Sequence, residues 1–144
     1  MKKHLPLILS ALLFSACEEK TSNTDIPEPL KETLLDTQST KSSNDHYIIE
    51  WKTIPANISV NEYFQMEFLV KEPMKPINYP VDLLVDAGMQ AHNHGMHTKP
   101  ITKRVDKQHF ISEGMLFHMP GEWQVELEIS RGIMKEKAVI EITL

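Results

Sequence analysis

Trp123-Gln-Val-Glu-Leu-Glu-Ile-Ser130, near the C-terminus, alternates apolar and polar residues without a break. Ala138-Val-Ile-Glu-Ile-Thr-Leu144 repeats the alternation after a turn near Arg131-Gly132. Because successive side chains of a strand point to opposite faces of a sheet, each run predicts a strand with one buried and one solvated face. The two runs together predict an antiparallel hairpin.

The same texture extends upstream as far as His46. Five more short alternating runs, separated by Pro, Gly, Asn and Asp, cover residues 47–51, 64–70, 81–85, 101–105 and 110–118. Seven short strands in about 99 residues, with no convincing helix, are typical of a β-sandwich. We therefore expect an all-β domain over residues 46–144, a seven-stranded antiparallel sandwich of immunoglobulin-like or cupredoxin-like shape.

The N-terminus has the pattern of an export signal. Met1-Lys-Lys-His precedes an apolar stretch that starts at Leu5, and small residues follow it. This order predicts a cleaved signal peptide over residues 1–16. The apolar stretch is too short for a resident transmembrane helix.

Cys17 follows Phe-Ser-Ala directly, which resembles the lipobox of bacterial lipoproteins. The resemblance implies that Cys17 is acylated, with palmitate among its acyl chains, and that the protein is anchored in a lipid bilayer outside the cytoplasm. Glu18, in place of Asp after the cysteine, implies sorting to the outer membrane and a periplasmic location. The alternative is a plain signal peptide with an incidental cysteine.

Residues 17–45 are rich in Thr, Ser, Glu and Lys and have few large apolar side chains. Such a composition cannot bury enough apolar surface to fold, so this segment is expected to be a disordered tether. As a flexible coil it would span roughly 30 Å.

Composition excludes several functions. Cys17 is the only cysteine, so the exported domain has no thiol nucleophile, CxxC pair, zinc ribbon or blue-copper centre of the His₂Cys type. The chain has 15 basic and 20 acidic residues, and without Lys2 and Lys3 the balance is 13 to 20, a net charge of −7. An acidic chain without a basic run is a poor nucleic-acid binder. The GxSxG and HExxH motifs are absent, and we predict no enzymatic activity.

Histidine and methionine are concentrated in one region. Five of the six histidines that follow Cys17 lie between residues 92 and 118, and four of the seven methionines lie between 89 and 119. Residues two apart in an extended segment point to the same side, so His92, His94 and Met96 can converge. Gly95 permits a turn that would bring His97 to the same place.

This residue chemistry predicts a metal site. Imidazole and thioether groups suit copper, and thioether favours Cu(I), whereas hard cations would require carboxylates. Copper is the first choice and zinc the second. The candidate ligands are His92, His94, Met96, His97, His118 and Met89. The alternative is a polar loop whose histidines hydrogen-bond to the backbone.

Strict alternation limits which residues around His118 can bind the same ion. Met115, Phe117 and Met119 would share one strand face and His118 would point the other way, so they cannot all be ligands unless a bulge intervenes near Gly114. Met115 and Met119 are expected to fill the core, because methionine packs irregular gaps well.

A family resemblance rests on two strings. Asp86-Ala-Gly-Met-Gln-Ala-His-Asn-His-Gly-Met-His-Thr-Lys-Pro100 and Phe117-His-Met-Pro-Gly-Glu-Trp123 resemble the YtkA-like domain, a family of small exported β-sandwich proteins. The resemblance covers residues 46–144 and implies a sandwich fold. It marks as matched polar or sulfur positions His92, His94, Met96 and His118. Pro120, Gly121 and Trp123 would be structural, and the family is linked to copper handling by association.

The first functional expectation is a membrane-anchored, extracytoplasmic copper-binding lipoprotein that delivers or sequesters copper, possible partners being a copper donor or acceptor protein. Its affinity should fall below about pH 6.5, because imidazole binds metal only when neutral. The alternative is an immunoglobulin-like protein-interaction module that binds no metal, in which the histidines are structural.

Overall fold

The computed structural model describes residues 37–144. The predicted signal peptide, the predicted acylation site Cys17 and the sorting residue predicted at Glu18 lie outside the described residues. Within residues 37–144, no helix has the length and apolar content that a membrane span requires.

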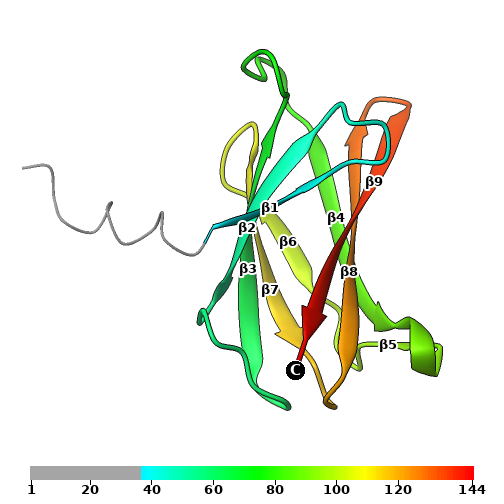
Figure 1. The fold of residues 1–144 in the computed structure, drawn as a ribbon. Helices are drawn as coiled ribbons and strands as arrows, with labels where there is room; N and C mark the ends of the chain where they lie inside the picture. The colour runs from blue at the N-terminus through cyan, green and yellow to red at the C-terminus, as the bar shows by residue number, and fades with distance from the viewer. Residues whose placement is uncertain (1–36) are drawn as a thin grey trace, which may run out of the picture.

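The described part of the chain is an all-β sandwich of two antiparallel sheets (Figure 1). Its elements are β1 (Gln38–Lys41), β2 (Ile48–Ile54), β3 (Tyr63–Lys71), β4 (Asp82–Met89), the short 3₁₀ helix η1 (Gln90–His92), β5 (His94–Gly95), β6 (Ile101–Arg104), β7 (His109–Leu116), β8 (Glu122–Arg131) and β9 (Met134–Thr143). The predicted fold class is confirmed, and the strand number is corrected from seven to nine. The two additional strands, β1 and β5, are short and carry no alternating pattern.

One sheet has the order β1-β2-β3-β7-β6 and the other β5-β4-β8-β9. In Figure 1, β4, β8 and β9 lie on the right. The predicted C-terminal hairpin is β8 and β9, which pair from Glu122↔Thr143 to Arg131↔Met134. Alternate side chains of β8 are fully buried and meet alternate side chains of β3 in the core, among them Trp123, Leu127, Met66 and Phe68. The period-two pattern therefore decides which face of each strand is buried.

The sandwich begins earlier than the sequence indicated. β1 pairs with β2 from Gln38↔Trp51 to Lys41↔Ile48. On its other side, the Thr40 hydroxyl donates to the Val139 carbonyl at 3.1 Å. The Ser43 N–H donates to the Lys137 carbonyl at 2.7 Å. Residues 38–45 therefore belong to the domain, and the tether boundary predicted at residue 45 is too late.

A bulge interrupts β7 near Gly114, where the sequence left one open. Phe64 pairs with Met115 but Met66 pairs with Ser112, so β7 carries one extra residue at this point. Gly114 takes a φ of +79°, a conformation that favours glycine. Because of the extra residue, Ser112 and Met115 are both buried. Alternation then resumes, Phe117 enters the core, and the following residues leave it.

Candidate metal centre

The first part of the histidine cluster is built on a tight hairpin at the end of β4. Met89 pairs with His94, and the Met96 N–H extends the ladder by donating to the Ala87 carbonyl at 3.1 Å. Between the two strands, η1 is followed by its C-cap Asn93, which has a left-handed φ of 51°. Asparagine is among the few non-glycine residues that adopt this conformation readily. The chain thus reverses within a few residues and places His92 and His94 near each other.

The second part comes from the connection between β7 and β8, which carries His118. The Asn61 N–H donates to the Phe117 carbonyl at 2.8 Å, and the Trp123 indole N–H donates to the Met119 carbonyl at 3.1 Å. Trp123 is fully buried and stacks on Phe117, with ring centroids 4.4 Å apart. These contacts hold the residues on both sides of His118, so its position is set by the core.

The structure brings together all four predicted histidines. The ring centroids of His92 and His94 are 5.8 Å apart, those of His94 and His118 5.1 Å, and those of His97 and His118 3.8 Å. The last pair is stacked, with an interplanar angle of 13°. His118 is the centre of the cluster, and the edge of its ring also packs near the Trp123 ring at 5.3 Å.

His118 has an unsatisfied polar atom. Its Nδ1 is buried and has no hydrogen-bond partner among residues 37–144. Burial, followed by the neighbouring His97 and His94, lowers the pKa of His118 below its ordinary value of 6.5. The imidazole is therefore neutral at pH 7 and keeps a lone pair. A buried polar atom without a partner is costly and is otherwise rare, so it marks a place where a ligand could supply the missing interaction.

The methionines have different surroundings. Met115 is fully buried and Met89 is only 2% exposed, so both are core residues, Met115 as predicted. A Cβ atom placed on Gly121 would lie 2.7 Å from the Met89 methyl carbon, which puts that methyl directly under the β7–β8 turn. Met96 and Met119 are half-buried and pack against the edge of the core. Of the two candidate methionine ligands, Met96 is the more accessible.

The cluster is not arranged as a finished metal site. Among residues 37–144, no three His, Cys, Asp or Glu side chains are already disposed to hold a metal ion. The stack of His97 on His118 turns ring faces toward each other instead of nitrogen lone pairs. The donor set itself, four imidazoles and a nearby thioether, fits copper better than a hard cation.

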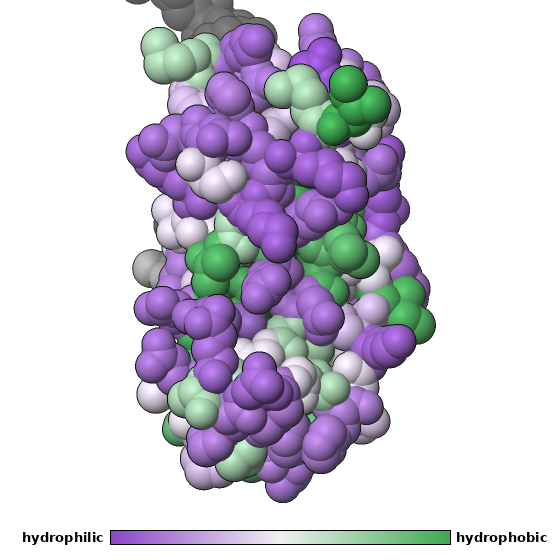
Figure 2. Space-filling view, turned by 90° about the vertical axis from the view of Figure 1, so that its right-hand side faces the viewer, coloured by the Kyte–Doolittle hydropathy of each residue, from purple (hydrophilic) through white to green (hydrophobic). Residues whose placement is uncertain are grey.

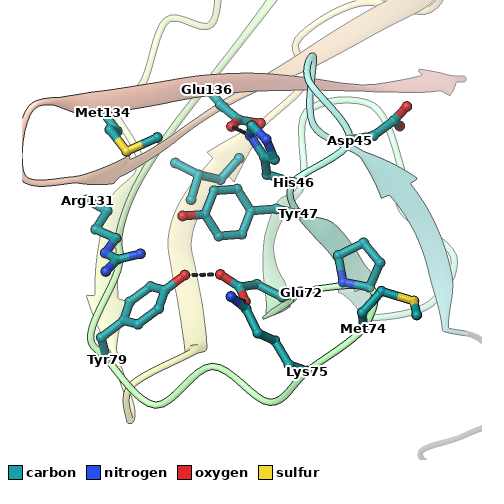
Figure 3. Close-up of a pocket in the computed structure, with 12 residues that line it drawn as sticks. Asp45, His46, Tyr47, Glu72, Met74, Lys75, Tyr79, Arg131, Met134 and Glu136 are labelled. Carbon is teal, nitrogen blue, oxygen red and sulfur yellow. Dashed lines mark hydrogen bonds and ion pairs between the residues drawn. The ribbon is translucent and has the colours of Figure 1, made fainter.

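Two hollows complete the description. One, of about 340 Å³, lies beside His94 and is also lined by Asp86, Gln124 and Glu126. The other, of about 370 Å³, lies at the opposite end of the sheets, around Tyr79 and Arg131 (Figure 3). The sequence did not point to the second hollow, because its lining comes from three separate segments without a shared motif. Comparison of the chain with known protein families, curated proteins and solved structures gave no match.

Proposed function

We propose that this protein is an extracytoplasmic lipoprotein that binds one copper ion at the end of the sandwich where β4, β5 and the β7–β8 connection meet. The observation that carries the proposal is a cluster of four imidazoles in which His94 and His97 contact His118 and His92 contacts His94. The buried Nδ1 of His118 has no partner among residues 37–144. A metal ion would supply that partner. Zinc is the second choice.

The ligands would be His94, His97 and His118, with His92 and the Met96 thioether completing the set for one or the other oxidation state. His97 is exposed, so its ring can turn off the His118 stack at little cost and direct a nitrogen toward the ion. Met89 is assigned to packing, because it is buried beneath Gly121. Imidazole and thioether together suit copper, and thioether favours the reduced ion.

The rest of the proposal concerns location. Cys17, if acylated, would hold the domain at the periplasmic side of the outer membrane. The site would then deliver copper to a protein partner or sequester it. The resemblance to the YtkA-like domain supports this assignment through the His-Xaa-His-Gly-Met element, which supplies His92, His94 and Met96.

The test is an anaerobic titration with Cu(I) against a competing chelator, repeated with Cu(II) and Zn²⁺. The protein is the full chain carrying Cys17→Ser, because a free thiol would itself bind copper. We expect one equivalent to bind more tightly than micromolar. His118→Ala should weaken binding by at least about 100-fold, since removing a ligand costs more than removing a second-shell partner. His109→Ala, at a histidine outside the cluster, should leave it unchanged.

Equal affinity in the His118→Ala and His109→Ala variants would refute this site, and failure of every ion to bind more tightly than micromolar would refute the function. Circular dichroism of each variant shows whether the fold is retained. The three ions are titrated on the same variants, so comparison of their affinities also selects the metal.

A specific observation favours the second candidate, a protein-interaction module. Asp86 and Glu126 are directly opposite each other on the exposed face of β4 and β8, and neither forms an ion pair within residues 37–144. Like charges in this position repel each other and are destabilising. A basic surface on a partner protein would relieve that repulsion. Figure 2, which faces this side of the molecule, shows a mainly hydrophilic surface with separate hydrophobic patches. If no metal binds, this face is the alternative site of function.

A further inference from the structure

The larger hollow lies where the β1–β2 loop, the β3–β4 connection and the β8–β9 turn meet, at the far end of the sheets from the histidine cluster (Figures 1 and 3). Its volume of about 370 Å³ is within the range of small-molecule sites. Most of its wall is apolar or aromatic, contributed by Tyr47, Pro73, Met74, Tyr79, Ile129 and Met134. Met74 is 93% exposed and Met134 58% exposed, so the rim offers apolar surface to solvent.

The carboxylates that line this hollow already have partners. Glu136 accepts hydrogen bonds from the Ser42 hydroxyl at 2.6 Å and from His46. Glu72 accepts from the Tyr79 hydroxyl, and its second oxygen, Oε2, which has no hydrogen bond within residues 37–144, lies 3.3 Å from the Lys75 ammonium. Asp45 pairs with Lys41 at 3.3 Å. Each carboxylate of the lining therefore has a hydrogen-bond or ion-pair partner within the protein.

Arg131 has no ion pair among residues 37–144, although its charge is near enough to Glu72 to help lower the pKa of that carboxyl. Its guanidinium carbon lies 3.6 Å over the ring of Tyr79, and no carboxylate among residues 37–144 lies within ion-pair distance of it. The hydrogen bond from Tyr79 to Glu72 fixes the ring on which the guanidinium rests, and Figure 3 shows Arg131 and Tyr79 side by side at the edge of the hollow. Guanidinium has five N–H donors in a planar fork that matches a carboxylate. The hollow therefore offers a ligand the N–H donors of Arg131 beside an apolar wall.

We propose that this hollow binds a small carboxylate with a linear apolar body. The carboxylate would accept two hydrogen bonds from Arg131, and the apolar chain would lie against Tyr47, Ile129 and Met134. Binding would bring the guanidinium into a charge-assisted bidentate pair, which is stronger than a hydrogen bond between neutral groups. It would also remove the exposed methyl groups at the rim from water.

The test is NMR of the full chain labelled with ¹³C at the methionine methyls, titrated with hexanoate to millimolar concentrations. The methyls of Met74 and Met134 line the hollow and should shift, whereas those of the core residues Met66 and Met115 should not. Acetate has the charge without the chain, and hexylammonium has the chain with the opposite charge. Both should bind at least about tenfold more weakly than hexanoate.

Arg131→Gln should weaken hexanoate binding by about tenfold or more. Arg104→Gln is the matched control, because Arg104 is an arginine outside the hollow that pairs with Asp82, and it should have no effect. No shift of the Met74 and Met134 methyls, tighter binding of hexylammonium, or unchanged affinity in Arg131→Gln would each overturn the proposal. None of these outcomes depends on whether copper binds at the other end.

Discussion

Glu136 combines a charge with almost complete burial, since it is only 5% exposed. Burial by itself raises the pKa of this carboxyl. The hydrogen bonds from Ser42 and His46 and the charge of His46 together lower the pKa by more than burial raises it, so the net pKa lies below its ordinary value of 4.5. A carboxyl with a lowered pKa in the folded state stabilises the fold above its unfolded pKa. That stabilisation disappears as the pH falls through the folded pKa.

We therefore expect the free energy of unfolding to fall as the pH drops below about 4.5, and Glu136→Gln to make this fall shallower. At pH 7 the same variant should be less stable by about 1–3 kcal/mol, because a charged acceptor in a buried network is lost. Urea unfolding between pH 3 and pH 7 measures both effects. Parallel pH profiles for the variant and the wild type would show that Glu136 is not the group responsible.

Gly121 has two constraints in one position. Its φ is +130°, and a Cβ there would lie 2.7 Å from the Met89 methyl carbon. Gly132 is the matched control, because it also has a positive φ, of +59°, but a Cβ there would meet nothing within 4 Å. Gly132→Ala should cost about 1–2 kcal/mol from backbone strain alone. Gly121→Ala should cost about 1–3 kcal/mol more, because a φ of +130° lies outside the left-handed region that alanine can adopt and the buried Met89 methyl must also move. Equal urea midpoints for the two variants would mean that neither the φ of Gly121 nor its contact with Met89 penalises a side chain there.

Two like charges face each other on the exposed side of β4 and β8 and give a prediction about stability. Glu126 faces Asp86 across the two strands without a cation partner in residues 37–144, whereas Glu128, two residues along, pairs with Lys135 at 2.6 Å. Glu126→Gln should stabilise the protein by about 0.2–1 kcal/mol at low salt. The gain should shrink at high salt, where surface charges are screened. Glu128→Gln should give no gain, and a gain of the same size there would attribute the effect to net charge instead.

Except for β6, which has no buried residue, the strands that the sequence predicted are the ones whose side chains alternate between the core and water. β8 shows this most clearly, because Trp123, Val125, Leu127 and Ile129 are all buried. β1 was missed because Gln38-Ser-Thr-Lys41 has no apolar face and is held by its backbone. β5 was missed because it has only two residues and depends on the reversal at Asn93. Strands held by backbone pairing alone leave no hydrophobic pattern in a sequence.

The sequence named the four histidines that the structure brings together, but it did not give their arrangement, and it also named Met89, which is buried in the core. The proximity of His92, His94 and His97 follows from a local reversal of the chain. Strict alternation in the sequence made a bulge near Gly114 the condition under which His118 and the neighbouring methionines could share a site, and the structure has a bulge there. The stack of His97 on His118 was not predicted, because it depends on how the β4–β5 hairpin packs against the β7–β8 connection. Such contacts between segments far apart in sequence carry no local signal.

The N-terminal boundary of the domain yields the last prediction. The sequence placed the start of the sandwich at residue 46, but Ser42 donates to buried Glu136 at 2.6 Å and accepts from the Tyr47 N–H at 2.9 Å. A chain that begins at His46 would lose β1, open the edge of β2 and leave the Glu136 carboxylate short of a donor. We expect it to be less stable than the full chain by at least about 2 kcal/mol in urea unfolding.

A chain that begins at residue 37 retains β1 and Ser42, and it should match the full chain. Ser42→Ala in the full chain separates the two contributions, because it removes the donor to Glu136 but keeps the strand. If the chains that begin at residues 37 and 46 have equal urea midpoints, the sandwich does not need β1, and the boundary predicted from sequence is the functional one. If only the shorter chain is destabilised, the polar segment before residue 46 is part of the folded domain.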